Sequence, residues 1–141
     1  MKIIQSSLSY DDVLSILIAG DGDFSPSLTS ALDIEQYALK LSKFANFVLL
    51  QDDSDYKGCI AYYENKEGNF IYITHYWVSR ELQGQGYGKR LFNELLEIVD
   101  SCFSEIRLEV VKGNPAFLFY LKQGFRSVED RGEKELLSLA R

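Results

Sequence analysis

The sequence has little of what a disulfide-bonded protein or a metal protein needs. Its 141 residues include two cysteines, Cys59 and Cys102, and one histidine, His75. Both cysteines lie in apolar stretches, and a structural metal site needs a tighter cluster of Cys and His ligands. We therefore expect two buried, reduced thiols and no metal site. Reduced thiols are usual in the cytoplasm, so we also predict a cytoplasmic protein.

A membrane-spanning run and a surplus of basic residues are also missing. No apolar segment approaches the roughly 20 residues that cross a bilayer, and the first residues do not resemble a signal peptide. Lys and Arg total 15 against 21 Asp and Glu, which gives a net charge of −6. Since nucleic acids attract clustered Lys and Arg, nucleic acid is not an expected partner, and without a spanning segment neither is a membrane. A cationic amine is compatible with this charge.

The composition that remains is typical of one folded domain. Hydrophobic residues make up 46% of the chain and charged residues 26%, and this length buries enough apolar surface for stability without disulfides. There are only two prolines, no internal repeat and no Pro/Gly/Ser-rich linker. We predict a single domain over residues 1–141.

Apolar periodicity predicts the order strand, two helices, three strands, helix, strand, helix, two strands. The strands are expected at residues 3–6, 47–51, 58–63, 70–78, 106–111, 125–129 and 135–139. The helices are expected after Ser9, after Asp33, at 88–99 and at 115–122, with a turn at 20–26 and a hairpin loop at 64–69. This order predicts an α/β (α+β) fold with a mixed, mostly antiparallel central sheet flanked by helices.

Each helix is expected to bury one apolar face. The expected faces are Val13, Leu14, Leu17 and Ile18 in the first helix, Ile34, Tyr37, Ala38, Leu41 and Phe44 in the second, and Leu91, Leu95, Leu96 and Val99 in the third.

A glycine-rich loop, Gln83-Gly84-Gln85-Gly86-Tyr87-Gly88, joins the strand at 70–78 to the helix at 88–99. Glycines permit a tight turn, and the N-terminus of a helix presents unpaired N–H groups and the positive end of its dipole. The segment predicts an anion site suited to a diphosphate, with Lys89 adding charge. It is not a Walker A loop, because Arg90 follows Lys89, and its alternating glycines do not match the Rossmann spacing.

Residues 78–88 resemble the acetyl-CoA signature of the GCN5-related N-acetyltransferases (GNATs): Gln or Arg, two residues, Gly, one residue, then Gly or Ala, with a strand-ending valine five residues earlier. The resemblance implies the GNAT fold and a site for acetyl-CoA. It implies that Tyr76, Trp77 and Val78 line the pantetheine arm. It also implies that Gln83, Gly84, Gln85, Gly86, Tyr87, Gly88 and Lys89 bind the pyrophosphate. A strand-to-helix turn without a ligand is the plain alternative.

A second segment, residues 109–125, is similar to a later motif of the same family. A strand is followed by Asn114-Pro115-Ala116 opening a helix, by Tyr120 near its end, and by Gly124-Phe125 starting a strand. Asn114 is expected to cap the helix and Gly124 to end it, with Phe117 and Leu121 on an apolar face. The resemblance implies that Asn114 contacts the CoA arm and that Tyr120 is the general acid. A core tyrosine is the alternative.

The mechanism implied by the resemblance is direct attack of a primary amine on the acetyl thioester. Tyr120 would protonate the leaving thiolate, because a phenol with a pKa near 10 stays protonated where a thiol of about 8.5 begins to ionise. A strand N–H near Val78 would stabilise the carbonyl oxygen. The base is left open between Glu109, which matches the base of some relatives, His75, for which a structural role is favoured, and ordered water.

The acceptor is expected to be a small-molecule amine or a protein amine. The aromatic residues that could line the acceptor pocket are Tyr10, Phe24, Tyr37, Tyr62, Tyr63, Tyr72 and Tyr76. Two alternatives stay open: a non-catalytic acyl-CoA-binding module, and acetylation of an amine carried on tRNA, which would need a basic rim. Family members are often dimers, so a homodimer through the exposed edge of the last strands is possible.

Overall fold

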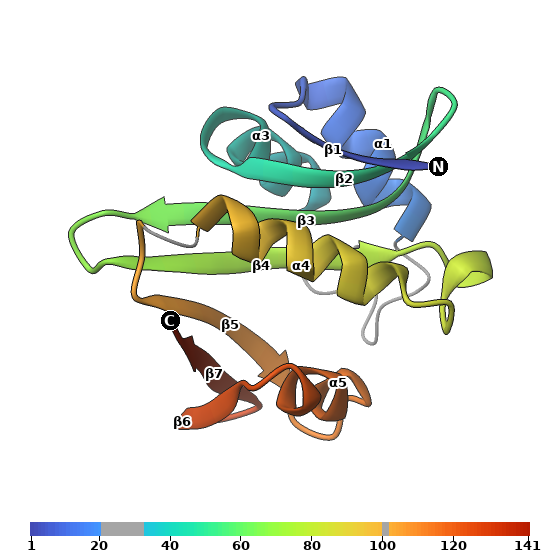
Figure 1. Cartoon of the computed structure of the whole chain (residues 1–141). Coiled ribbons are helices and arrows are strands. Elements are labelled where there is room, and N and C mark those ends of the chain that lie inside the picture. Colours follow the sequence, from blue (N-terminus) through green and yellow to red (C-terminus); the bar gives the residue numbers. More distant parts are fainter. Residues whose placement is uncertain (21–32, 100–101) are drawn as a thin grey trace. The chain divides into compact units, whose positions relative to one another are not determined.

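The computed structural model describes residues 1–20, 33–99 and 102–141 (Figure 1). Phe24 and all but the first residue of the turn expected at 20–26 therefore lie outside the described residues. The chain forms two compact units: Met1–Tyr62 with His75–Ile98, and Tyr63–Thr74 with Val99–Arg141. The order of elements is the one predicted from the sequence.

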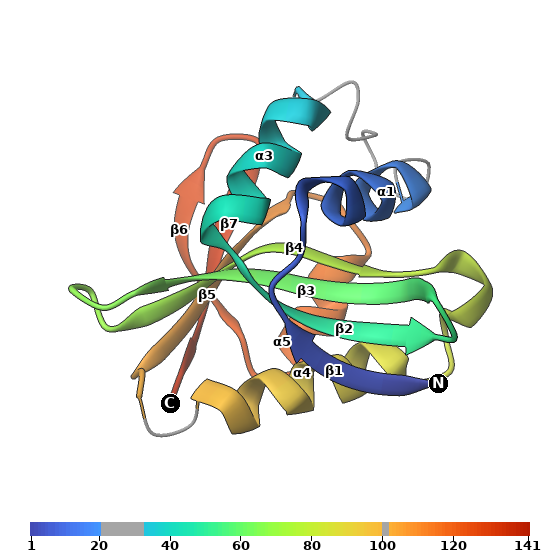
Figure 2. The ribbon, with the colours of Figure 1, turned by 90° about the horizontal axis from the view of Figure 1, so that it is seen from above.

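The first unit holds strands β1 (Lys2–Ser6), β2 (Asn46–Asp52) and most of β3 (Asp55–Asn65). Strand β2 pairs antiparallel with both β1 and β3. Helices α1 (Tyr10–Gly20) and α3 (Ile34–Phe44) cover one face of these strands, and α4 (Tyr87–Val99) covers the other (Figures 1 and 2). Both faces of β2 are thus covered, and its four central residues are all buried. A strand buried on both faces gives a continuous apolar run in place of an alternating one.

The first two helices begin where their capping residues predict. The Ser9 hydroxyl accepts a hydrogen bond from the Asp12 N–H at 3.2 Å. The Asp33 carboxylate accepts from the N–H groups of Glu35 and Gln36, both at 3.1 Å. Each cap satisfies N–H groups that have no partner within the helix.

The predicted helix faces are mostly confirmed. Val13 and Leu17 of α1, Ala38 and Leu41 of α3, and Leu91, Leu95 and Val99 of α4 are buried, together with Phe92, which was not predicted. Ile18 and Phe44 were predicted wrongly, since they are 59% and 67% exposed. Ile18 follows Leu17 by 100° around the helix, and Phe44 is the last residue of α3, so neither side chain continues the buried stripe.

The second unit contains the one parallel pair among the described strand registers. The start of β4 (Phe70–Val78) runs parallel to β5 (Glu105–Val111), with Phe70 opposite Glu105. β5 and β6 (Arg126–Arg131) each pair antiparallel with β7 (Lys134–Ala140). The sheet order is β1-β2-β3-β4-β5-β7-β6, which confirms the predicted mixed, mostly antiparallel sheet.

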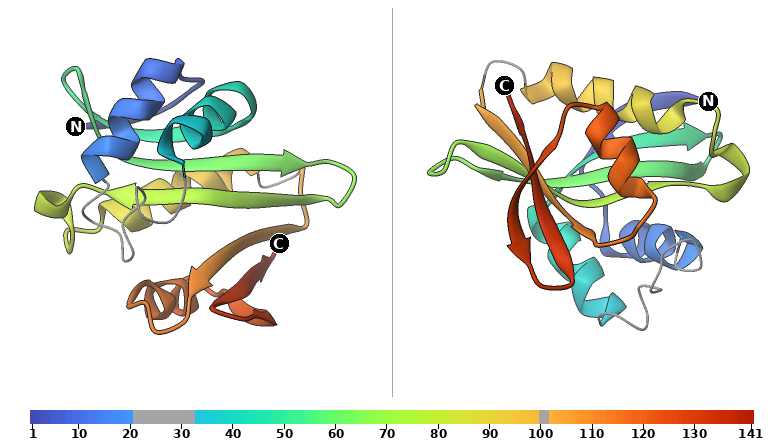
Figure 3. Two further views of the ribbon diagram at one scale, coloured as in Figure 1. Left: turned by 180° about the vertical axis from the view of Figure 1, so that it is seen from behind. Right: turned by 90° about the horizontal axis from the view of Figure 1, so that it is seen from below.

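Helix α5 (Ala116–Lys122) leads from β5 to the β6–β7 hairpin (Figure 3). The Asn114 side chain accepts from the Ala116 N–H at 2.9 Å, as expected of a cap. Gly124 has φ +104°, and the N–H groups of Gly124 and Phe125 donate to Leu121 and Tyr120, the paired bonds of a glycine-terminated helix. Leu121 does not form the predicted buried face, because this seven-residue helix leaves it 40% exposed.

The two cysteines differ in their exposure to solvent. Cys59 on β3 is fully buried, and burial raises the pKa of its thiol to about 12. Cys102 was wrongly predicted to be buried: it is exposed in the turn after α4, where its N–H donates to Val99. No helix within the described ranges is long and apolar enough to cross a membrane.

Candidate functional site

The predicted anion loop is an open turn between β4 and α4. After Val78 come one turn of 3₁₀ helix, Arg80–Leu82, then turn residues 83–86, and α4 begins at Tyr87. Gly84 and Gly86 have φ +80° and +86°, a conformation that other residues adopt at a cost. A Cβ on either glycine would have nothing within 4 Å. Both glycines are therefore needed by the backbone, and both border open space.

The first turn of α4 offers hydrogen-bond donors to an anion. Its first backbone bond runs from Arg90 N to Gly86 O at 3.1 Å, so the N–H groups of Gly88 and Lys89 precede the helical ladder. The Lys89 side chain is exposed, and the guanidinium of Arg90 lies over the Tyr87 ring at 5.3 Å. Unpaired N–H groups, the dipole and two cations together favour an anionic ligand.

Three side chains of the predicted site bind the protein's own backbone. The Gln83 amide donates to Val78 O at 3.0 Å, and the Gln85 amide donates to Glu81 O at 3.1 Å. The Tyr76 hydroxyl donates to Gly88 O. These contacts hold the loop against the end of β4 and the start of α4, a function that the sequence motif does not reveal because it does not show where a side chain points.

Trp77 lies on the other side of the chain at this point. Its indole is 5% exposed, and a Cβ on Gly20 at the end of α1 would lie 2.8 Å from the indole nitrogen. The side chain therefore packs against α1.

His75 is a buried residue beside Tyr37 of α3. It is 4% exposed, and its ring centroid lies 6.4 Å from that of Tyr37. Burial lowers the pKa of His75 to about 4, so the imidazole is neutral at pH 7. These features are typical of a core histidine.

This lowered pKa predicts a pH-dependent stability. Unfolded His75 binds a proton below pH 6.5 whereas the folded residue does so only near pH 4, so stability is lost as the pH falls through this window. Between pH 7 and pH 5 the loss attributable to His75 is about 2 kcal/mol. Urea unfolding of the native chain and of His75→Phe at both pH values measures it. An equal loss in both proteins would contradict the prediction.

In the second unit, Tyr120 lies between two aromatic rings. The centroids of Phe119 and Phe125 are 5.7 and 5.8 Å from that of Tyr120, both with edge-to-face geometry. Burial raises the pKa of Tyr120 to about 12. The phenol therefore keeps its proton at neutral pH, as a general acid must before it acts.

Glu109 belongs to a polar cluster that the sequence analysis did not predict. Its carboxylate accepts from the Tyr72 hydroxyl at 2.9 Å and lies 3.5 Å from the Arg131 guanidinium. Burial, followed by the bond to Glu109, raises the pKa of Tyr72. The cluster therefore consists of a carboxylate held between a phenol and a cation.

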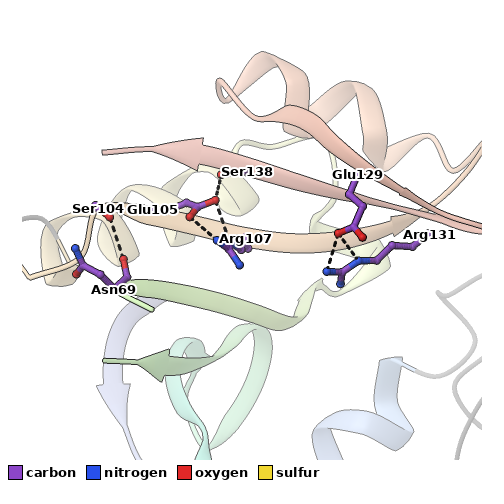
Figure 4. A network of polar contacts seen from close by, with 7 residues as sticks. All are labelled: Asn69, Ser104, Glu105, Arg107, Glu129, Arg131 and Ser138. Atoms are coloured by element: carbon purple, nitrogen blue, oxygen red, sulfur yellow. Dashed lines mark hydrogen bonds and ion pairs between the residues drawn. The ribbon is translucent and has the colours of Figure 1, made fainter. Parts of the chain in front are cut away.

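Further ion pairs and hydrogen bonds lie on the strands of this unit (Figure 4). Arg131 also pairs with Glu129 at 3.0 Å. Glu105 pairs with Arg107 at 2.9 Å and accepts from Ser138. The alternation of Glu105, Arg107 and Glu109 in the sequence places all three on one face of β5, and this signal could have identified the cluster.

The model of the "Acetyltransferase (GNAT) family" matches residues 13–125. No curated protein sequence matches the chain significantly.

Solved structures show the same fold. The paiA N-acetyltransferase of Thermoplasma acidophilum, crystallised with coenzyme A, is 20% identical, with a TM-score of 0.79 and full coverage of both chains. Tetrahymena GCN5 is 18% identical, with a TM-score of 0.73 over 99% of this chain and 96% of the other. The ribosomal-protein-S18-alanine N-acetyltransferase of Escherichia coli is 16% identical, with a TM-score of 0.73 over 99% and 94%.

Proposed function

This chain belongs to the acetyltransferase (GNAT) family, and we propose that it transfers an acetyl group from acetyl-CoA to a primary amine. The observation that carries the proposal is the open turn with left-handed Gly84 and Gly86, which leads into the unpaired N–H groups of α4. Such a turn suits the pyrophosphate of CoA. The crystallised complex of a similar acetyltransferase with coenzyme A supports this choice of ligand.

We assign the cofactor contacts to the glycine turn, to the end of β4 and to Asn114. The N–H groups of residues 84–89 and the Lys89 ammonium bind the pyrophosphate, and Gln83 holds the loop that presents them. The main chain of Tyr76, Trp77 and Val78 holds the pantetheine arm, because the Trp77 indole is occupied by α1. Asn114, whose side chain caps α5, is assigned a contact with the same arm on the family resemblance alone.

The proposed reaction forms one bond and breaks one. The neutral amine attacks the acetyl carbon, a C–N bond forms, and the C–S bond breaks with its electron pair leaving on sulfur. A backbone N–H near Val78 stabilises the carbonyl oxygen while it carries charge. Tyr120 donates to the departing sulfur. An acceptor that arrives as an ammonium ion loses one proton before the attack and a second as the amide forms. Each goes to Glu109 or to ordered water, and His75 is the weakest candidate because its ring is buried beside Tyr37.

The acceptor is proposed to be a cationic amine on a small molecule or a protein. The net charge of −6 favours a substrate that arrives as an ammonium ion. Two of the similar solved structures are named as N-acetyltransferases, one of them for an alanine of ribosomal protein S18. These names support amine acetylation as the reaction class.

Calorimetric titration with acetyl-CoA, desulfo-CoA and NAD tests the proposal. We expect both CoA ligands to bind and NAD not to bind, since NAD lacks the pantetheine arm. A panel of amines is then screened for thiol release from acetyl-CoA. Absence of CoA binding at saturating concentrations would refute the function, and binding without thiol release for any amine would favour a non-catalytic acyl-CoA-binding module.

A further inference from the structure

We propose that Tyr76 is a positioning residue for the pyrophosphate loop, acting through the hydrogen bond from its hydroxyl to Gly88 O. This inference rests on the proposed function, since it assumes that the loop binds a diphosphate. It gives Tyr76 a different role from the pantetheine wall implied by the family resemblance.

The bond acts on a peptide group that belongs to the anion site. Gly88 O and the N–H of Lys89 are two ends of one peptide unit. That N–H lies in the first turn of α4, before the helical ladder starts at Arg90. A donor on the carbonyl end polarises the peptide and strengthens the N–H as a donor. The Tyr76 hydroxyl therefore increases the attraction of the Lys89 N–H for an anion.

Other contacts hold the rest of the loop in the same way. The Gln83 amide fastens it to Val78 O, and the Gln85 amide fastens it to Glu81 O. The carboxylate of Glu81 pairs with Lys57 of β3 at 3.1 Å. Of these contacts, the bond from Tyr76 alone reaches the first turn of α4. A loop held in this way loses little conformational freedom when a ligand binds.

Removal of the hydroxyl should weaken diphosphate binding selectively. In Tyr76→Phe the ring stays, and we expect the dissociation constant of CoA to rise about three- to tenfold, the size of one lost hydrogen bond. The affinity for inorganic pyrophosphate, measured by displacement of CoA, should fall by a similar factor. The affinity for pantetheine, which lacks the diphosphate, should be the same in the variant as in the native chain. All three are measured by calorimetry, with Tyr10→Phe as the control for loss of a half-buried tyrosine hydroxyl on α1.

A second variant guards against a folding defect. Fluorotyrosine at position 76 keeps the shape of the side chain and is a stronger donor, so CoA should bind it at least as tightly as the native residue. Unchanged CoA affinity in Tyr76→Phe would overturn this proposal alone, as would an equal weakening of pantetheine. Failure of the native chain to bind CoA would overturn the proposed function and this proposal together.

Discussion

Replacement of Tyr120 by phenylalanine should lower kcat by about 100- to 1,000-fold, the usual contribution of a general acid. The affinity for acetyl-CoA should stay within about twofold, because the ring remains between Phe119 and Phe125 and only the hydroxyl is lost. Steady-state kinetics with an acceptor from the amine screen, together with calorimetry, separate the two effects. Full activity in the variant would remove the general-acid assignment. A parallel loss of affinity and stability would indicate a core tyrosine.

The raised pKa of Tyr120 bears on how it can act. The pKa of the buried phenol is about 12 and that of a free thiol is near 8.5, so Tyr120 is still protonated when the thiolate forms and can donate to it. We therefore expect Tyr120 to stabilise the sulfur by a hydrogen bond while the C–S bond breaks. The expected kinetic signature is a larger loss in Tyr120→Phe for poor leaving groups than for acyl donors whose thiol is more acidic. An equal loss for all donors would argue against contact with the sulfur.

The fold was readable from the sequence where local chemistry fixes it. Asp33 and Asn114 cap helices, and Gly124 ends one in a left-handed conformation, so the boundaries of α3 and α5 follow from single side chains. Strand β2 was identified from its apolar run. The exposure of Ile18, Phe44 and Leu121 was not readable, because a side chain at the edge of the buried stripe or in the last turn of a helix can fit the apolar pattern without being covered.

For the candidate site, the sequence predicted the main-chain conformation of the glycine turn. Gly84 and Gly86 were expected in a turn, and both have positive φ. Side-chain partners were not readable, because they depend on strands that are distant in sequence. Tyr72 and Glu109 are 37 residues apart, and Arg131 joins them from β6. In the same way, the Tyr76 hydroxyl binds Gly88 twelve residues later, which needs the β4–α4 geometry as well as the motif.

Gly86→Glu should reduce CoA affinity by at least about 100-fold. Gly86 has φ +86° and open space around its Cβ position, so the new carboxylate would extend into the space assigned to the pyrophosphate. Like charges in such contact cost several kcal/mol, and about 1.4 kcal/mol corresponds to a tenfold change in affinity. The left-handed backbone adds about 1–2 kcal/mol of strain for any residue with a Cβ. Calorimetry with acetyl-CoA measures the loss.

Strain and charge can be separated because the chain offers a matched position. Gly132, in the β6–β7 turn, has φ +82° and also has nothing within 4 Å of a Cβ. Gly132→Glu therefore carries a similar strain and the same added charge, yet it should bind acetyl-CoA like the native chain. Gly86→Ala carries the strain without the charge and should lose much less affinity than Gly86→Glu. If Gly86→Glu bound CoA normally, the residues around this turn would not hold the pyrophosphate. If Gly132→Glu lost binding equally, general destabilisation would explain both variants.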